Sequence, residues 1–271
     1  VSPTDWVSFY STSPTKIGMV RFHYDAVAGA ITVVHSHEVS NVTLDTDGDG
    51  LNYISADYDE AQGKWLLGVN SSDVPTQMAF LIVSENGSSF TIHAHDKFTS
   101  SYMARCGVAW KGTDKFVVWQ NYWGGNDSSP YLSVMHITGG TSISDPNKRL
   151  ALSYSNDNRN TNSGFWVGDS VFVLGGFYLQ YFSIDASDNI TSINTDLGAT
   201  VSSDYVGYNL NPHLSYYDPA TKTVHFYGGY TSYKFKVKVI FNDDFSERTF
   251  VSETQTYIAG LHNANWIDHI D

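Results

Sequence analysis

The stretch Tyr217-Asp218-Pro219-Ala220-Thr221-Lys222-Thr223-Val224-His225-Phe226 joins a polar turn to an apolar run, and versions of it recur along the chain. A turn of the same character precedes an apolar run in residues 58–67, 111–118 and 168–173. A further copy is divided between the two ends of the sequence, residues 6–10 and 266–268. A repeat of this size indicates one supersecondary unit that is stacked or arranged radially.

The apolar runs that follow the turns are almost evenly spaced. They begin at Trp6, Trp65, Phe116, Val171 and Val224, so that successive copies start 59, 51, 55 and 53 residues apart. The last copy, continued through the C-terminus to the residues before Trp6, again spans about one period. Five units of one kind therefore account for all 271 residues.

Each period reads as four short strands. Residues 234–241 alternate strictly between polar and apolar side chains, which is typical of a half-buried strand. Turns rich in Gly, Asn and Asp separate the third strand from the fourth, as in residues 85–88 and 186–189. No segment has a sustained apolar stripe of helical period, so we expect almost no helix.

Four antiparallel strands in a repeat of this length are typical of a β-propeller blade. Over its whole length the chain resembles five-bladed β-propellers. The blades would be residues 1–50 with 261–271, 51–100, 101–158, 159–206 and 207–260. In the blade shared by both ends, the C-terminal segment would supply the first strand and the N-terminal segment the other three. This pairing would close the ring and remove its free sheet edges.

A β-sandwich or a β-solenoid with regular hairpins is the alternative architecture. The repeat lacks the Gly-His and Trp-Asp pairs of WD40 blades, and it shows no kelch pattern beyond its Gly-Gly pairs. Five-bladed propellers include sugar-binding lectins and furanosidase-type glycoside hydrolases. The resemblance therefore implies either a binding module or an enzyme.

The composition restricts the classes of partner. The chain has 15 Lys and Arg residues against 28 Asp and Glu residues, a net charge of −13, which does not suit nucleic acid or an anionic membrane. No apolar run is long enough to insert into a membrane. The only cysteine, Cys106, excludes an internal disulfide and is expected to be buried. We expect a protein that is extracellular, on a cell surface or on a virion, and processed from something longer because it begins with Val1.

The most specific short motif is acidic and lies in residues 45–52. Three carboxylates at alternate positions before a glycine resemble the start of a calcium loop. The ligands would be Asp45, Asp47, Asp49 and the backbone carbonyl of Leu51. Tyr53 and Ala56 stand where further ligands are usual. The segment therefore predicts a calcium site or, alternatively, a solvated connection between blades.

Polar residues recur where the first strand of each predicted blade begins. These residues are Asn52, Arg105, Asn162, Asn211 with His213, and His262 with Asn263. A ring of amides with one guanidinium could hydrogen-bond sugar hydroxyls or a carboxylate. The alternative is a ring of polar groups that hydrates a narrow central channel.

Aromatic residues beside glycine at strand ends form a second candidate ligand surface. Tyr122 and Trp123 precede Gly124-Gly125, and Tyr230 follows Gly228-Gly229. An aromatic ring can stack on a sugar while nearby Asn and Asp side chains bind its hydroxyls. Alternatively, these rings fill the space between blades.

Two histidine pairs at i and i+2, His35 with His37 and His93 with His95, each place two rings on one side of an outer strand. That spacing can bind zinc or copper, although polar rings on an outer strand need no ligand.

The residues of a glycoside hydrolase are not visible in the sequence. Such an enzyme needs two carboxylates on inner strands. The five glutamates fall in predicted turns or on outer strands; they are Glu38, Glu60, Glu85, Glu247 and Glu253. Asp57 lies on a first strand, but near its far end. Catalysis is therefore not the favoured interpretation.

The sequence predicts a non-catalytic module that binds a glycan or a protein receptor on a cell surface. A virion or tail fibre would be a suitable setting. One alternative is a structural building block of an extracellular or viral assembly. The other is a furanosidase-type glycoside hydrolase.

Overall fold

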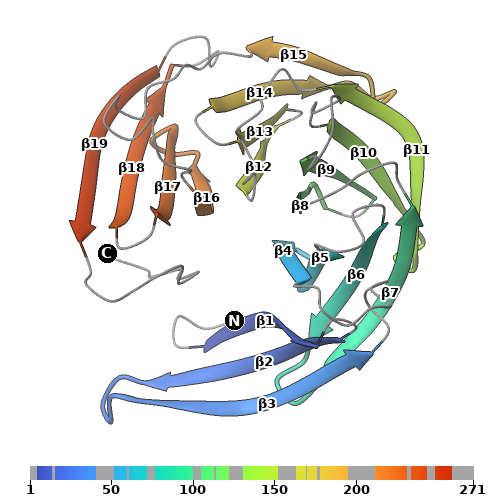
Figure 1. Cartoon of the computed structure of the whole chain (residues 1–271), viewed down its shortest axis with the longest axis vertical. Coiled ribbons are helices and arrows are strands. Elements are labelled where there is room, and N and C mark those ends of the chain that lie inside the picture. Colours follow the sequence, from blue (N-terminus) through green and yellow to red (C-terminus); the bar gives the residue numbers. More distant parts are fainter. Residues whose placement is uncertain are drawn as a thin grey trace. The chain divides into compact units, whose positions relative to one another are not determined.

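The computed structural model describes residues 5–13, 16–40, 52–59, 61–71, 77–99, 105–112, 114–121, 131–151, 163–168, 170–175, 178–194, 211–230, 233–242 and 248–257. Within these ranges the regular structure consists of β-strands arranged in five sheets, with no helix (Figure 1). The prediction of an all-β chain is confirmed for these ranges. This part of the chain accordingly contains no helix with the length and apolar character needed to cross a membrane.

The first two sheets are formed by neighbouring strands in chain order. The first sheet contains β1 (Asp5–Ser13), β2 (Lys16–Asp25) and β3 (Ala30–Ser40). The second contains β4 (Asn52–Asp59), β5 (Lys64–Ser71), β6 (Gln77–Glu85) and β7 (Phe90–Thr99). Every adjacent pair in both sheets is antiparallel.

The other three sheets also follow chain order. The third contains β8 (Arg105–Trp110), β9 (Lys115–Asn121), β10 (Tyr131–Thr138) and β11 (Ser142–Ala151). The fourth contains β12 (Ser163–Val167), β13 (Ser170–Gly175), β14 (Tyr178–Ile184) and β15 (Ile190–Asn194). The fifth contains β16 (Asn211–Asp218), β17 (Thr223–Tyr230), β18 (Tyr233–Phe241) and β19 (Arg248–Tyr257). The repeat starts at Trp65, Phe116, Val171 and Val224 each fall in the second strand of a sheet, as predicted.

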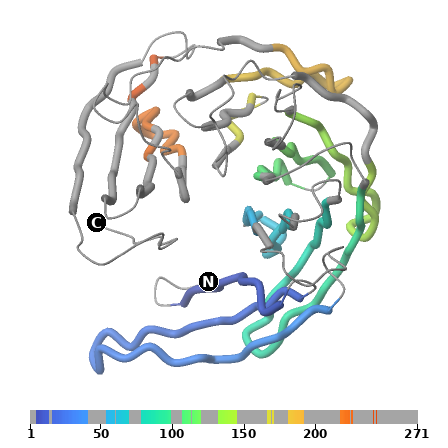
Figure 2. The backbone as a smooth tube through the Cα atoms, viewed as in Figure 1, coloured from blue at the N-terminus to red at the C-terminus, as the bar shows by residue number. Residues whose placement is uncertain are grey.

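The chain divides into two compact units. One comprises Val1–Phe116 with Met135–Pro146, and the other comprises Val117–Val134 with Asn147–Asp271. The strands of the first and second sheets lie wholly in the first unit, where they follow one another from residue 5 to residue 99 (Figure 2).

The repeated turn owes its shape to an aspartate that ends the first strand. Asp59 Oδ1 accepts the Ala61 N–H at 3.0 Å, and Asp218 Oδ1 accepts the Ala220 N–H at 2.9 Å. Such a side chain replaces a backbone acceptor and closes the turn locally. Four residues after each aspartate the backbone is left-handed, at Gly63 (φ 63°) and Lys222 (φ 52°). The sequence repeat is thus a repeat of turn geometry.

The core of the first unit lies on both sides of the second sheet. Ala79, Leu81 and Val83 of β6 pack in a cluster with Ile17 and Met19 of β2. On the other face of β6, the Phe80 ring lies 5.7 Å from that of Phe98 and 5.2 Å from that of Phe116. This sandwiched position explains why the run from Met78 to Val83 is apolar without alternation.

The opposite face of the first sheet carries several exposed apolar side chains. Trp6 and Tyr10 of β1 are 44% and 43% exposed, and Ile31 and Val33 of β3 are 67% and 61% exposed. Trp6 contacts Tyr24 with ring centroids 5.9 Å apart. The first sheet thus buries one apolar face, while several apolar side chains on its other face are exposed.

Candidate functional site

The predicted ligand residues Asn52 and Arg105 occupy corresponding positions on neighbouring strands. The Val108 N–H donates to Ser55 Oγ at 3.1 Å, and the Trp110 N–H donates to Asp57 Oδ2 at 2.6 Å. Both contacts join residues 53 positions apart, so β4 and β8 run side by side in the same direction. Asn52 and Arg105 are also 53 positions apart and begin these two strands.

Two further predicted residues, Asn211 and Tyr230, have backbone positions at one end of the fifth sheet. Asn211 pairs with Gly229 across β16 and β17, and Tyr230 is the next residue of β17. The register of this pair shifts between Pro212 and Leu214, so His213 lies at a β-bulge. The first residue of β16 and the last residue of β17 therefore lie at the same end of the sheet.

The remaining predicted site residues lie outside the described residues. They are Asn162, His262, Asn263, Tyr122 and Trp123, together with the calcium ligands Asp45, Asp47, Asp49 and Leu51. Within the described ranges, no group of three or more His, Cys, Asp or Glu side chains could hold a metal ion. The full amide ring and the calcium loop stay predictions.

Asp57 is a carboxyl group in an unusual environment. Its Oδ1 accepts the Tyr58 N–H at 2.9 Å, while its Oδ2 accepts the Trp110 N–H. Burial raises the pKa of Asp57 to about 6, although the hydrogen bonds from Trp110 and Tyr58 favour the ionised form. Both oxygens thus accept main-chain N–H groups, and one of them satisfies the edge of β8. The geometry assigns Asp57 to joining two sheets.

A second contact of the same kind lies on the outer strands. The Ile143 N–H of β11 donates to Asp96 Oδ2 of β7 at 2.7 Å. Carboxylates therefore join the second and third sheets on inner strands through Asp57 and on outer strands through Asp96. An unpaired N–H group on a sheet edge can pair with a strand of another chain, and the Asp57 and Asp96 carboxylates accept hydrogen bonds from such groups here.

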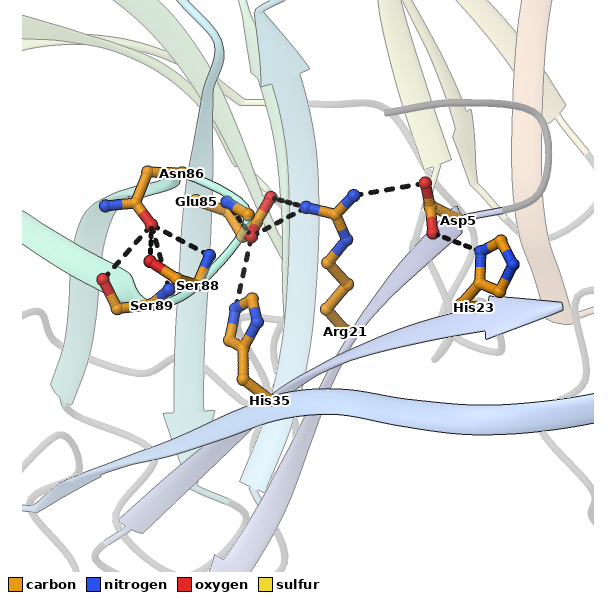
Figure 3. A network of polar contacts seen from close by, with 9 residues as sticks. Asp5, Arg21, His23, His35, Glu85, Asn86, Ser88 and Ser89 are labelled. Carbon is orange, nitrogen blue, oxygen red and sulfur yellow. Dashed lines mark hydrogen bonds and ion pairs between the residues drawn. The ribbon is translucent and has the colours of Figure 1, made fainter.

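The largest polar cluster that the structure describes joins the first and second sheets. Arg21 lies between Glu85 and Asp5, with two histidines at the ends of the cluster (Figure 3). Arg21 Nη1 donates to both Glu85 oxygens, at 3.0 and 2.8 Å, and Nη2 donates to Asp5 Oδ2 at 3.1 Å. Hydrogen bonding to Glu85, followed by that to Asp5, raises the pKa of Arg21 despite its burial. We call Asp5, Arg21, His23, His35 and Glu85 the Arg21 cluster.

The two histidines extend the Arg21 cluster. His23 Nδ1 is 2.9 Å from Asp5 Oδ1, and His35 Nε2 is 3.2 Å from Glu85 Oε1. The Glu85 side chain is only 4% exposed. Each carboxylate therefore has Arg21 and one histidine as partners, an arrangement that fixes the first sheet on the second.

Sequence reasoning missed this cluster because it depends on strand register. Asp5 pairs with His23 across β1 and β2, and Arg21 pairs with His35 across β2 and β3. These four ionisable groups thus share one face of the first sheet with the buried Ile17 and Met19. Glu85 was expected in a turn, whereas the structure places it as the last residue of β6. The alternating charged residues of β2 were the only local signal.

Comparisons with known proteins indicate the fold of the chain but do not assign it to a family. No protein-family model matches the chain, and no curated protein matches its sequence. A functionally unknown protein from Desulfotomaculum acetoxidans has a similar structure, with a TM-score of 0.53 at 15% identity over 91% of this chain and 69% of that one. A protein from Lactobacillus plantarum matches with a TM-score of 0.51 at 11% identity, over 92% and 70% of the two chains.

A third similar structure is that of a proposed 6-phosphogluconolactonase from Bacteroides uniformis. Its TM-score is 0.51 at 10% identity, over 94% of this chain and 83% of that one. The structural matches are to β-propeller proteins, so they support a β-propeller fold. At sequence identities this low, the structural matches indicate the fold alone.

Proposed function

We propose that this β-propeller has five blades closed by its two ends, and that it binds a glycan or a protein receptor without catalysis. The binding face would be the one where the inner strands begin. The observation that carries this proposal is the matched position of Asn52 and Arg105 on β4 and β8. It supports a shared face for at least two of the predicted ligand residues.

Closure is supported by the strand count of the described sheets. The second to fifth sheets have four strands each, whereas the first has three, with β1 at its edge. Residues 261–271 would supply the missing inner strand beside β1. The exposed Trp6 and Tyr10 on β1 would then gain a neighbour.

The chemistry of the proposed face suits polar ligands. Amide side chains donate and accept hydrogen bonds, and guanidinium binds carboxylates through paired N–H donors. The residues would be Asn52, Arg105, Asn162, Asn211, His213, His262 and Asn263. Tyr122, Trp123 and Tyr230 would supply aromatic surface for stacking on a sugar ring. A secreted, cell-surface or virion protein would use such a face to attach to a receptor.

Asp57 supports the choice of binding over glycoside hydrolysis. Hydrolysis requires an acid and a second carboxylate on opposite sides of the scissile bond. Asp57 is the inner-strand carboxyl group whose pKa is near neutral, but both of its oxygens accept main-chain N–H groups. Its environment is explained by the contact between β4 and β8.

The test is a glycan array probed with the wild-type protein and two matched variants. Arg105→Ala changes the beginning of β8, and Lys111→Ala changes the residue just after its other end. We expect the wild type and Lys111→Ala to bind the same glycan, and Arg105→Ala to lose at least about tenfold in affinity, which corresponds to about 1.4 kcal/mol. Equal losses in both variants would contradict a site at the start of β8.

A structural building block is the second candidate. A blank array together with a large buried interface in a native assembly would favour it over receptor binding. The Lys111→Ala and Arg105→Ala variants then serve to map that interface. Turnover of a polysaccharide that is lost in Asp57→Asn would instead favour the glycoside hydrolase.

Calcium binding by Asp45, Asp47, Asp49 and the Leu51 carbonyl is part of the proposal. Three carboxylates around a site without bound cation repel one another, so calcium should stabilise the folded chain. We expect chelator to lower the melting temperature of the wild type, and to leave that of Asp47→Ala unchanged. An identical effect of chelator on both proteins would exclude this site.

A further inference from the structure

The turn between β6 and β7 contains Asn86-Gly87, which is the one Asn-Gly pair in the sequence. Both residues are exposed, and the turn adjoins Glu85 of the Arg21 cluster. We propose that this turn is a self-modifying site. Asn86 loses its side-chain amide as ammonia through a succinimide and becomes aspartate or isoaspartate.

The electrophile is the Asn86 side-chain carbonyl, whose oxygen is surrounded by donors (Figure 3). Asn86 Oδ1 accepts the Ser88 N–H at 3.0 Å and the Ser89 N–H at 2.9 Å. The hydroxyls of Ser88 and Ser89 donate to the same oxygen at 3.0 and 3.3 Å. Donors held around a carbonyl oxygen stabilise the negative charge that develops there when a nucleophile attacks.

The nucleophile is the Gly87 main-chain nitrogen. Its N–H donates to Glu85 Oε1, so a carboxylate is in place to accept the proton. Gly87 has a φ of 91°, and it presents no side chain that would cover its own nitrogen. Asn86 and Gly87 are covalent neighbours, so the reaction is intramolecular and benefits from proximity.

The reaction balances with water as the only other reactant. The Gly87 nitrogen passes its proton to Glu85 and forms a bond to Asn86 Cγ, while the carbonyl π electrons move onto Oδ1. The tetrahedral intermediate collapses, and Nδ2 takes the proton and leaves as ammonia. Water then adds to one of the two succinimide carbonyls and breaks its bond to nitrogen. Cleavage at Cγ gives aspartate, and cleavage at the main-chain carbonyl gives isoaspartate.

The product would disturb the packing of the first two sheets. Isoaspartate lengthens the main chain by one carbon and adds a negative charge next to Glu85. It also moves the oxygen that Ser88 and Ser89 now share. The modification would therefore weaken the turn that holds Glu85 against Arg21.

The test compares the folded protein with the same chain in denaturant. Both are incubated at neutral pH, and peptide mass spectrometry follows loss of the Asn86 amide and formation of isoaspartate. Asn189 is an exposed asparagine in the β14–β15 turn that precedes Ile190, and it serves as the internal control. We expect loss of the Asn86 amide to be at least about tenfold faster in the folded state, which corresponds to an activation free energy lower by about 1.4 kcal/mol. Asn189 should keep its amide.

Two sets of variants assign the roles of the neighbouring groups. Ser88→Ala with Ser89→Ala, and separately Glu85→Gln, should lower the folded rate several-fold and leave the denatured rate unchanged. Lys16→Ala removes an exposed ion pair outside the Arg21 cluster and keeps Glu85 in place, so it should not slow the reaction. Retention of the amide in the folded protein, or a rate below that of the denatured chain, would overturn the proposal.

Discussion

At the scale of single residues, the side chains that matter most join one sheet to another. Asp57 accepts two main-chain N–H groups, and Glu85 holds Arg21 through both of its oxygens. Each of these carboxylates is largely withdrawn from water. Substitution of Asp57 and of Arg21 therefore tests two different contacts between sheets.

Asp57 should make the folded chain less stable as the pH rises. Its folded pKa of about 6 lies above the ordinary value of 3.8, so the folded state keeps the proton more tightly than the unfolded state. The contribution of Asp57 to the free energy of unfolding is greatest below pH 3.8, and it falls by about 3 kcal/mol as the pH rises through about 6. The Asp57→Asn variant lacks this pH-dependent loss of stability because the asparagine side chain does not ionise. Urea unfolding of both proteins across that window should show the variant gaining on the wild type, and a constant difference would contradict the assignment.

Arg21→Ala should destabilise the protein strongly. Glu85 would remain with its side chain only 4% exposed and without its guanidinium, and breaking a buried pair costs about 3 kcal/mol or more. Lys16→Ala is the control, because Lys16 and Glu38 form a 2.7 Å pair with both side chains more than 40% exposed. An exposed pair contributes about 0–1 kcal/mol. Equal unfolding free energies for the two variants would show that the Arg21 cluster does not hold the first sheet on the second.

At the scale of elements, side-chain acceptors replace strand pairing at the sheet edges. Asp96 accepts the Ile143 N–H of β11, as Ser55 and Asp57 accept N–H groups of β8. We expect Asp96→Ala to speed hydrogen exchange of the Ile143 amide by about tenfold, the effect of losing about 1.4 kcal/mol. The Leu81 amide inside β6 should be unchanged. Unaltered exchange at Ile143 would mean that the contact does not protect β11.

Strand identity was predictable from the sequence because it is local. The turn chemistry at Asp218 lies within the β16–β17 hairpin, and the strict alternation of residues 234–241 coincides with β18. Contacts between sheets were not predictable, since they depend on register. Arg21 meets Glu85 across 64 positions, and no local pattern in the sequence pairs the two residues. The matched places of Asn52 and Arg105 followed from the repeat itself, whereas their ligand did not.

At the scale of the whole molecule, the five described sheets and the similarity to β-propeller proteins agree with the repeat. The closed five-bladed ring is the central claim, because the predicted ligand residues converge on one face only if the inner strands form such a ring. Closure depends on residues 261–271 lying beside β1. These residues include Leu261, Trp266 and Ile267, whose burial would contribute about 1.5–3 kcal/mol each.

The most direct measurement is thermal unfolding of the chain shortened to residues 1–260, with and without a synthetic peptide of residues 261–271. We predict that the shortened chain melts at least about 10 °C below the full chain, since about 1 kcal/mol shifts the midpoint by 2–4 °C in a protein of this size. The added peptide should restore most of the loss by pairing as a strand. A shortened chain that melts at the temperature of the full chain, with no response to the peptide, would contradict a ring closed by its two ends.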